Sequence, residues 1–142
     1  QEFVHLADQI EIEFVDEGMR IEMVESADDI FFQIGSSNMH PESKKILRDI
    51  GSQLATISNL IVVEGHTDAR PFVSAGRDYS NYELSADRAN AARRELIAGG
   101  LEADRIFEIR GYADKMLRDV QDPFNVVNRR ISIIIKFTQN ER

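Results

Sequence analysis

The sequence predicts an α+β fold, a two-layer α/β sandwich with a mixed sheet and its helices on one face. Three observations support this prediction: apolar and charged residues alternate near both ends, a short stretch in the middle is apolar throughout, and two longer segments have helical periodicity. The predicted order is hairpin, helix, strand, helix, strand, strand, or β-α-β-α-β-β with the hairpin counted once. Right-handed crossovers would place each helix on the same side of the sheet.

The first ten residues predict a short N-terminal helix. The stretch "QEFVHLADQI" places Phe3, Leu6 and Ile10 at spacings of three and four residues. We interpret residues 1–10 as the end of a linker helix, followed by one domain over residues 11–138 and a tail over residues 139–142. A single domain fits the length of 142 residues.

Two alternating stretches predict a β-hairpin with one solvated face. They are "IEIEFV" (residues 10–15) and "MRIEMV" (residues 19–24), and Asp16-Glu17-Gly18 lies between them as the turn. A loop-like stretch follows, and its apolar residues predict a plug for the core: Ile30, Phe31 and Phe32.

The two helices are predicted over residues 40–57 and from residue 81 to residue 98. Pro41 suits the first turn of the first helix, because its missing N–H is not needed there. Ser80 and Glu83 form a capping box for the second helix, which should end at Gly99-Gly100. A narrow stripe of mostly small residues would let this helix pack closely on the sheet: Ser85, Ala89, Ala92 and Leu96.

Three further strands complete the predicted sheet. The stretch "LIVVEG" (residues 60–65) is apolar on both faces, as a central strand should be. The stretches "RIFEIRGY" (residues 105–112) and "RRISIIIKF" (residues 129–137) alternate. Residues 113–128, between them, should form a loop or a short helix. Alternation also places Arg129 and Arg130 on opposite faces of the sheet. One of them would support the edge of the core, and the other would lie among the loops that border the candidate site.

Composition excludes several classes of function. The net charge of −8 argues against a nucleic-acid partner, because binding to phosphates requires clustered Lys and Arg. The absence of cysteine excludes disulfides, thiolate zinc sites and a cysteine nucleophile. The longest apolar runs are far shorter than the roughly 20 residues of a membrane span, and no secretory leader is evident. No Walker loop or dinucleotide fingerprint indicates a cofactor.

A polar cluster at the end of the central strand is the candidate site. Glu64, His66 and Asp68 offer at most three metal donors, and the other histidines lie in different elements, so we expect no metal site. A hydrolase with His66 and Asp68 as an acid–base pair is a second interpretation. No further catalytic group supports it, and a strand end held by hydrogen bonds to its own loop accounts for the same residues.

A third interpretation joins Asp68 to Arg88, which lies in the N-terminal half of the following helix. A strand–loop–helix unit can bring these two charges to the same edge, where they would form a receptor for a zwitterion. Arg88 would bind a carboxylate with its guanidinium fork, and Asp68 would accept from an ammonium. An ordinary salt bridge between Asp68 and Arg88 is the structural alternative.

Four stretches in order, "VVEGHTDARP", "SNYELSADRANAARRELIAGGL", "RIFEIRGYAD" and "NRRISIII", resemble the OmpA-like peptidoglycan-binding domain. The resemblance runs from about Ile30 to Phe137. It implies binding without chemistry: members hold the diaminopimelate of the peptidoglycan stem peptide through the positions of Asp68 and Arg88. It further implies that four neighbouring residues shape or border the pocket: Thr67, Asn81, Leu84 and Arg129. The two charges would bridge each other when the pocket is empty.

Within this family the sequence is most similar to the MotB branch, the periplasmic domains of flagellar stators. That similarity implies a non-enzymatic, dimeric domain that anchors the stator to the cell wall so that ion flow generates torque. An N-terminal inner-membrane helix and a MotA-type partner subunit, both outside this sequence, are also implied. The alternative is a wall anchor of an outer-membrane or secretion-system protein of the same family.

Overall fold

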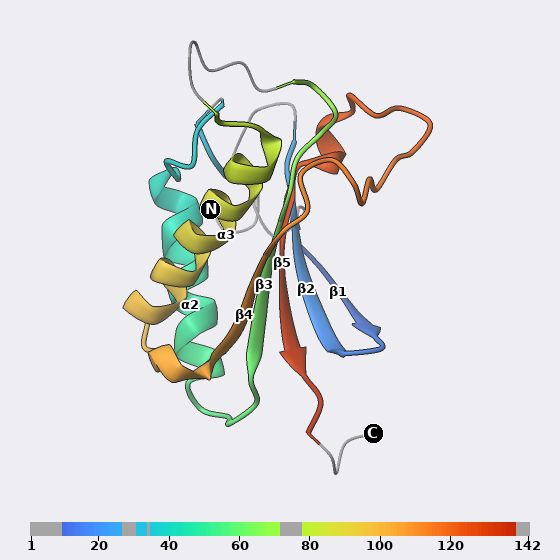
Figure 1. The fold of residues 1–142 in the computed structure, drawn as a ribbon. Helices are drawn as coiled ribbons and strands as arrows, with labels where there is room; N and C mark the ends of the chain where they lie inside the picture. The colour runs from blue at the N-terminus through green and yellow to red at the C-terminus, as the bar shows by residue number, and fades with distance from the viewer. Residues whose placement is uncertain (1–9, 27–30, 34, 72–77, 139–142) are drawn as a thin grey trace.

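The computed structural model describes residues 10–26, 31–33, 35–71 and 78–138. Its five strands form one sheet with the order β1-β2-β5-β3-β4, and two helices pack on one face of that sheet (Figure 1). The elements in chain order are β1 (Ile10–Val15), β2 (Gly18–Val24), α2 (Pro41–Leu54), β3 (Ile61–His66), α3 (Asn81–Ala98), β4 (Ile106–Gly111) and β5 (Arg130–Lys136). Two short 3-10 helices are η1 (Ala103–Arg105) and η2 (Val126–Asn128).

The sheet is mixed, as predicted. Strands β3 and β4 are parallel, whereas the pairs β1–β2, β2–β5 and β5–β3 are antiparallel. The described parts of the chain place no helix on the second face, which we call the open face (Figure 1). The two-layer α+β prediction is therefore confirmed, with all the predicted strands present.

The hairpin is also confirmed, with a detail that the sequence did not reveal. Asp16 and Glu17 form the turn, and Gly18 already belongs to β2. A Cβ atom on Gly18 would lie 1.9 Å from the carbonyl oxygen of Ile135, so this glycine permits the close approach of β2 and β5. The N-terminal helix was predicted over residues 1–10. Residues 1–9 lie outside the described residues, and the prediction is wrong for Ile10, which begins β1.

The core lies between the sheet and the two helices. Phe31 and Phe32 are buried in it, as predicted for the plug, whereas Ile30 lies outside the described residues. The stripe of α3 is fully buried and consists of Ser85, Ala89, Ala92 and Leu96. A Cβ on Gly65 of β3 would lie 2.0 Å from the carbonyl oxygen of Ser85. Small residues therefore let the backbones of α3 and β3 pack directly against each other.

The helix ends differ slightly from the prediction. Helix α2 begins at Pro41 but ends at Leu54, and Ile57 beyond it is exposed. Helix α3 begins with the predicted capping box, in which the Tyr82 N–H donates to Ser80 Oγ at 3.1 Å and the Ser80 N–H donates to Glu83 Oε1 at 2.6 Å. The left-handed backbone conformation falls on Gly100, with φ of 129°.

Residues 113–128 form a long loop with η2 near its end, visible in orange at the upper right of Figure 1. The loop lies at the end of the sandwich where β3 finishes and α3 begins (Figure 1). Across the described residues, no helix is both long and apolar enough to cross a membrane.

Candidate ligand-binding site

The chain beyond β3 is fixed to the 113–128 loop by main-chain hydrogen bonds. The Thr67 N–H donates to the Ala113 carbonyl at 2.8 Å, and the Ala69 N–H donates to the Pro123 carbonyl at 2.9 Å. These bonds fix residues 67–69 to the loop, and a hydrogen bond from Asn81 to the Arg70 carbonyl connects the next residue to the start of α3. Backbone hydrogen bonds thus position the polar side chains that follow the strand.

All six residues that the sequence analysis assigned to the site line one cavity of about 210 Å³. They come from three regions, the end of β3, the N-terminal half of α3 and the start of β5. The described lining consists of Gly35, Thr67, Asp68, Arg70, Pro71, Asn81, Leu84, Arg88 and Arg129. We call this cavity the pocket. Its volume is in the range of a small ligand rather than of a single water molecule.

Asp68 supplies the negative charge of the pocket. The carboxylate is buried, and its Oδ1 accepts from the Arg70 N–H at 2.9 Å. Its Oδ2 lies 3.3 Å from Nε of Arg129. The ion pair therefore joins Asp68 to Arg129 rather than to Arg88, and the predicted salt bridge with Arg88 is wrong. Sequence spacing could not reveal this, because Arg129 lies 61 positions after Asp68 and reaches it only through the sheet order.

Arg88 supplies a buried positive charge on the helix side of the pocket. Its Nε donates to the Ser36 carbonyl at 2.8 Å, and its Cζ lies 4.8 Å from the centroid of the Phe32 ring. A guanidinium over an aromatic face gains a cation–π contact. Together the two contacts fix the plane of the guanidinium in the wall of the pocket.

The remaining predicted residues complete the wall. Thr67 Oγ1 donates to the carbonyl of Asp68 at 2.8 Å, and Asn81 Nδ2 donates to the Arg70 carbonyl at 2.8 Å. Leu84 is a buried apolar wall residue. Thr67 and Asn81 thereby hold the main chain at Asp68 and two residues after it. Arg70 also lines the pocket but was not among the predicted residues, although its position two residues after Asp68 could have indicated it.

His66 is directed to a different partner from the one that the hydrolase interpretation requires. Its Nε2 lies 3.7 Å from Glu64 Oε1, and its ring stacks on Tyr112 with centroids 5.1 Å apart. Burial lowers the pKa of His66, so the neutral imidazole is favoured in the fold. Asp68 pairs instead with Arg129. In the described residues, no group of three or more His, Cys, Asp or Glu side chains could hold a metal ion.

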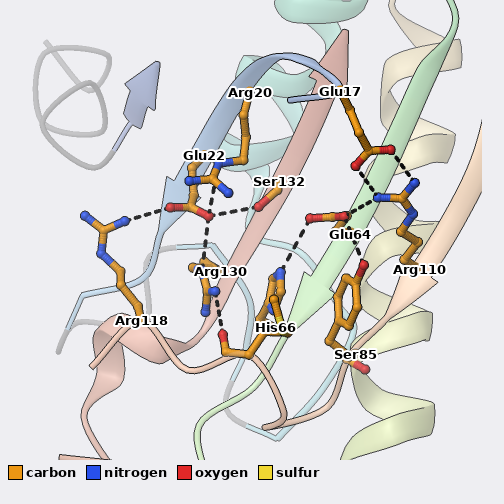
Figure 2. Close-up of polar contacts among 12 residues, drawn as sticks. Glu17, Arg20, Glu22, Glu64, His66, Ser85, Arg110, Arg118, Arg130 and Ser132 are labelled. Carbon is orange, nitrogen blue, oxygen red and sulfur yellow. Dashed lines mark hydrogen bonds and ion pairs between the residues drawn. The ribbon is translucent and has the colours of Figure 1, made fainter. Parts of the chain in front are cut away.

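A second polar cluster lies on the open face of the sheet, and Figure 2 shows how its charges converge. Glu22 accepts from Arg118 at 2.6 Å, from Arg130 at 3.1 Å and from Ser132 at 2.9 Å. Burial raises the pKa of Glu22, but Arg130 and the Ser132 hydroxyl lower it more, so the net pKa is below its usual value. Arg130 thus lies on the open face and Arg129 at the pocket, as alternation predicted.

Glu64 is the centre of the other half of this polar cluster, which we call the open-face network. Arg110 donates to Glu64 at 2.7 Å and also to Glu17 at 2.7 Å (Figure 2). The Tyr112 hydroxyl lies 3.4 Å from Glu64 Oε2. Burial raises the pKa of Glu64, but His66 and Arg110 lower it more, so the carboxylate is ionised at neutral pH. This network was not predicted from the sequence. The alternation of β2, β4 and β5 placed the charges on one face but did not predict their register.

Comparisons with known proteins agree with this architecture. The OmpA family matches residues 31–130. Motility protein B of Escherichia coli (strain K12) is 42% identical over 137 residues, which cover 96% of this chain and 44% of that protein. This chain therefore spans less than half the length of that relative.

Two solved structures share the fold at lower identity. The periplasmic domain of Helicobacter pylori MotB aligns with a TM-score of 0.74 and 21% identity, covering 92% of this chain and 90% of that chain. The cell wall anchor of the T6SS from Pseudomonas aeruginosa aligns with a TM-score of 0.74 and 20% identity, covering 96% and 93%. At this identity the likeness concerns the fold alone. The family match covers most of the chain, and the chain belongs to the OmpA family.

Proposed function

We propose that this domain binds the peptide stem of cell-wall peptidoglycan without covalent chemistry. One observation carries the proposal: Asp68 and Arg88, the positions expected to bind diaminopimelate, line the same pocket from two different elements. A zwitterionic amino-acid end carries an ammonium and a carboxylate close together. A pocket with one fixed anion and one fixed cation is complementary to both charges.

Each charge has a definite role in the proposed complex. Arg88 binds the ligand carboxylate, since its guanidinium can donate two parallel hydrogen bonds. Asp68 accepts a hydrogen bond from the ligand ammonium. The ammonium then either shares the Asp68 carboxylate with Arg129 or replaces Arg129 as its partner. Thr67, Asn81 and Leu84 shape the pocket. The contacts that fix Arg88 to Ser36 and Phe32 reduce the entropy lost on binding.

The biological role that we propose is to anchor a flagellar stator to the cell wall in the periplasm. The 42% identity to Motility protein B over nearly the whole chain favours this role over an outer-membrane or secretion-system anchor. In this proposal a membrane helix N-terminal to residue 1 holds the protein in the inner membrane, beside a MotA-type subunit. The domain acts as a homodimer, and attachment to the wall lets ion flow generate torque.

Binding without turnover is part of the proposal. His66 contacts Glu64 and Tyr112, so an acid–base pair with Asp68 would require a different arrangement of these side chains. No specific contact in the pocket favours hydrolysis. Mass analysis of peptidoglycan fragments after incubation with the protein separates the two classes, and release of cleaved products would contradict the proposal.

The test of the pocket is a pull-down with purified sacculi, using Asp68→Asn and Arg88→Ala. Each variant removes a charge-assisted contact and should weaken binding by about 1.5–3 kcal/mol, or roughly 10- to 150-fold. Arg48→Ala is a matched control, because Arg48 is an exposed arginine paired with Glu95. Circular dichroism verifies that the variants fold. Wild-type binding by both pocket variants would overturn the assignment.

A further inference from the structure

Three large apolar side chains are exposed on the loop that borders the pocket. Met116 is 55% exposed, Val120 is 71% exposed and Phe124 is 52% exposed. Exposure of a single apolar residue is common, but several on one loop call for an explanation. Phe124 differs from the other two because it contacts a residue of the pocket.

The loop holds Phe124 in a defined place through a buried asparagine. Asn128 has no exposed surface; it accepts from the Asp119 N–H at 2.7 Å and donates to the carbonyls of Asp122 at 3.1 Å and Pro123 at 3.2 Å. The Asn125 side chain closes the adjoining 3-10 turn by accepting from the Val127 N–H. The residues on both sides of Phe124 are therefore fixed, and its exposure belongs to the folded state.

The Phe124 ring lies outside the pocket, beside one of its lining residues. Arg70 lines the pocket, and its Cζ lies 5.9 Å from the centroid of the Phe124 ring. Pro123, the residue before Phe124, accepts from the Ala69 N–H at 2.9 Å. A ligand that leaves the pocket past Arg70 thus meets an exposed aromatic ring with a guanidinium beside it.

The chemistry of the proposed ligand identifies what would cover this ring. A stem peptide is a branch of a polymer, so an N-acetylated amino sugar is linked to the peptide that occupies the pocket. One face of such a sugar ring presents C–H groups, whereas its hydroxyl and acetamide groups lie at the edge. An aromatic ring can pack against the apolar face, and a guanidinium can donate to the edge oxygens.

We propose that Phe124 and Arg70 form a sugar platform, a subsite beside the pocket that packs against an amino sugar of the glycan strand. This inference rests on the proposed function and deepens it. The pocket holds the charged end of the peptide, and the sugar platform adds affinity for the peptide when it is attached to glycan. The domain thereby distinguishes wall-bound stem peptides from free peptides of the same sequence.

The test compares two ligands in solution by isothermal titration calorimetry: a free stem tripeptide that ends in diaminopimelate, and the same tripeptide attached to its disaccharide. The wild type should bind the disaccharide form more tightly. Phe124→Ala should weaken that binding by about two- to tenfold and leave the affinity for the free tripeptide unchanged. Phe124→Tyr retains the ring and should restore the difference.

Phe107→Ala is the matched control, because Phe107 is 55% exposed on the edge strand β4 and contacts Lys136 instead of the pocket. It should change neither affinity. Equal weakening of both ligands by Phe124→Ala would overturn the sugar platform, since the ring would then act on the pocket itself. An unchanged affinity for both would also overturn it and would indicate that Phe124 contacts another partner, such as a protein.

The outcomes separate this inference from the proposed function. If Asp68→Asn binds the free tripeptide as tightly as the wild type does, the assignment of the pocket fails, whatever Phe124→Ala does. If Asp68→Asn weakens both ligands and Phe124→Ala selectively weakens the disaccharide form, both proposals stand. If only the Phe124→Ala difference is missing, the pocket stands and the sugar platform does not.

Discussion

Two buried carboxylates, Glu22 on the open face and Asp68 in the pocket, are held in different ways. Two arginines and a hydroxyl donate to Glu22 within 3.1 Å, and Glu22 belongs to β2, which lies between β1 and β5 in the sheet. Asp68 has a backbone N–H at 2.9 Å and an arginine at 3.3 Å, and it borders a cavity of about 210 Å³. A carboxylate surrounded by protein donors stabilises the fold, whereas one beside an open volume can exchange a partner for a ligand.

The largest expected effect concerns stability at the open face. Glu22→Gln removes the charge that Arg118 and Arg130 share, and a buried arginine is then left without its counter-ion. Loss of one partner from a buried pair typically costs about 3–5 kcal/mol. Urea denaturation measures the change in the free energy of unfolding.

Glu13→Gln serves as the control, because Glu13 is half exposed and pairs with Arg20 at the surface. Exposed pairs contribute at most about 1 kcal/mol. Equal losses in Glu13→Gln and Glu22→Gln would remove the distinction between the open-face network and ordinary surface charge. Binding to sacculi by folded Glu22→Gln should match the wild type.

The next effect concerns the close contact that connects the two regions. In Gly65→Ala the new methyl group meets the carbonyl of Ser85, so α3 must move away from β3. Overpacking of this kind costs about 1–3 kcal/mol. Because α3 carries Arg88, this movement also changes its distance from Asp68. Stability and binding should both fall, whereas the exposed control Arg48→Ala should change neither; calorimetry of unfolding and of binding on the same samples measures both changes.

The smallest effect is the pH dependence of stability at the open face. The pKa of His66 is lowered by burial, so the unfolded chain takes up a proton before the folded one does, and stability should begin to fall as pH drops below 6.5. The pKa values of Glu22 and Glu64 are also lowered, so their contribution is present above 4.5 and is lost as pH falls through the folded pKa values.

Denaturation midpoints between pH 7.5 and 4 measure this dependence. His66→Gln should remove the part that begins near 6.5 and leave the acid part that begins near 4.5. If the stability of His66→Gln depends on pH as steeply as that of the wild type between pH 6.5 and 4.5, protonation of His66 does not cause the loss of stability in this range.

The sequence predicted the elements well because their signals are local. The capping box at Ser80 and Glu83 and the small-residue stripe of α3 lie within a few turns of chain. The pocket could be predicted in composition, since the family resemblance named its residues. The ion pair of Asp68 with Arg129 could not, because it depends on β5 lying next to β3.

The open-face network was beyond the sequence for the same reason. Glu22 and Ser132 are opposite each other in the β2–β5 register and are 110 positions apart in the chain. Periodicity assigns each of them to a face but does not give the partner. Arg118 comes from a loop without regular periodicity, and only the folded loop brings it to Glu22.

The position of β5 determines when the domain can fold. In the sheet order, β5 separates the hairpin of β1 and β2 from the parallel pair of β3 and β4, although it comes after all of them in the chain. Before residues 130–136 are available, the chain has only two separate pairs of strands, and isolated two-stranded units are marginally stable. The domain therefore stays incompletely folded until β5 is available, and a truncation before Arg130 removes the strand that holds the two halves of the domain together.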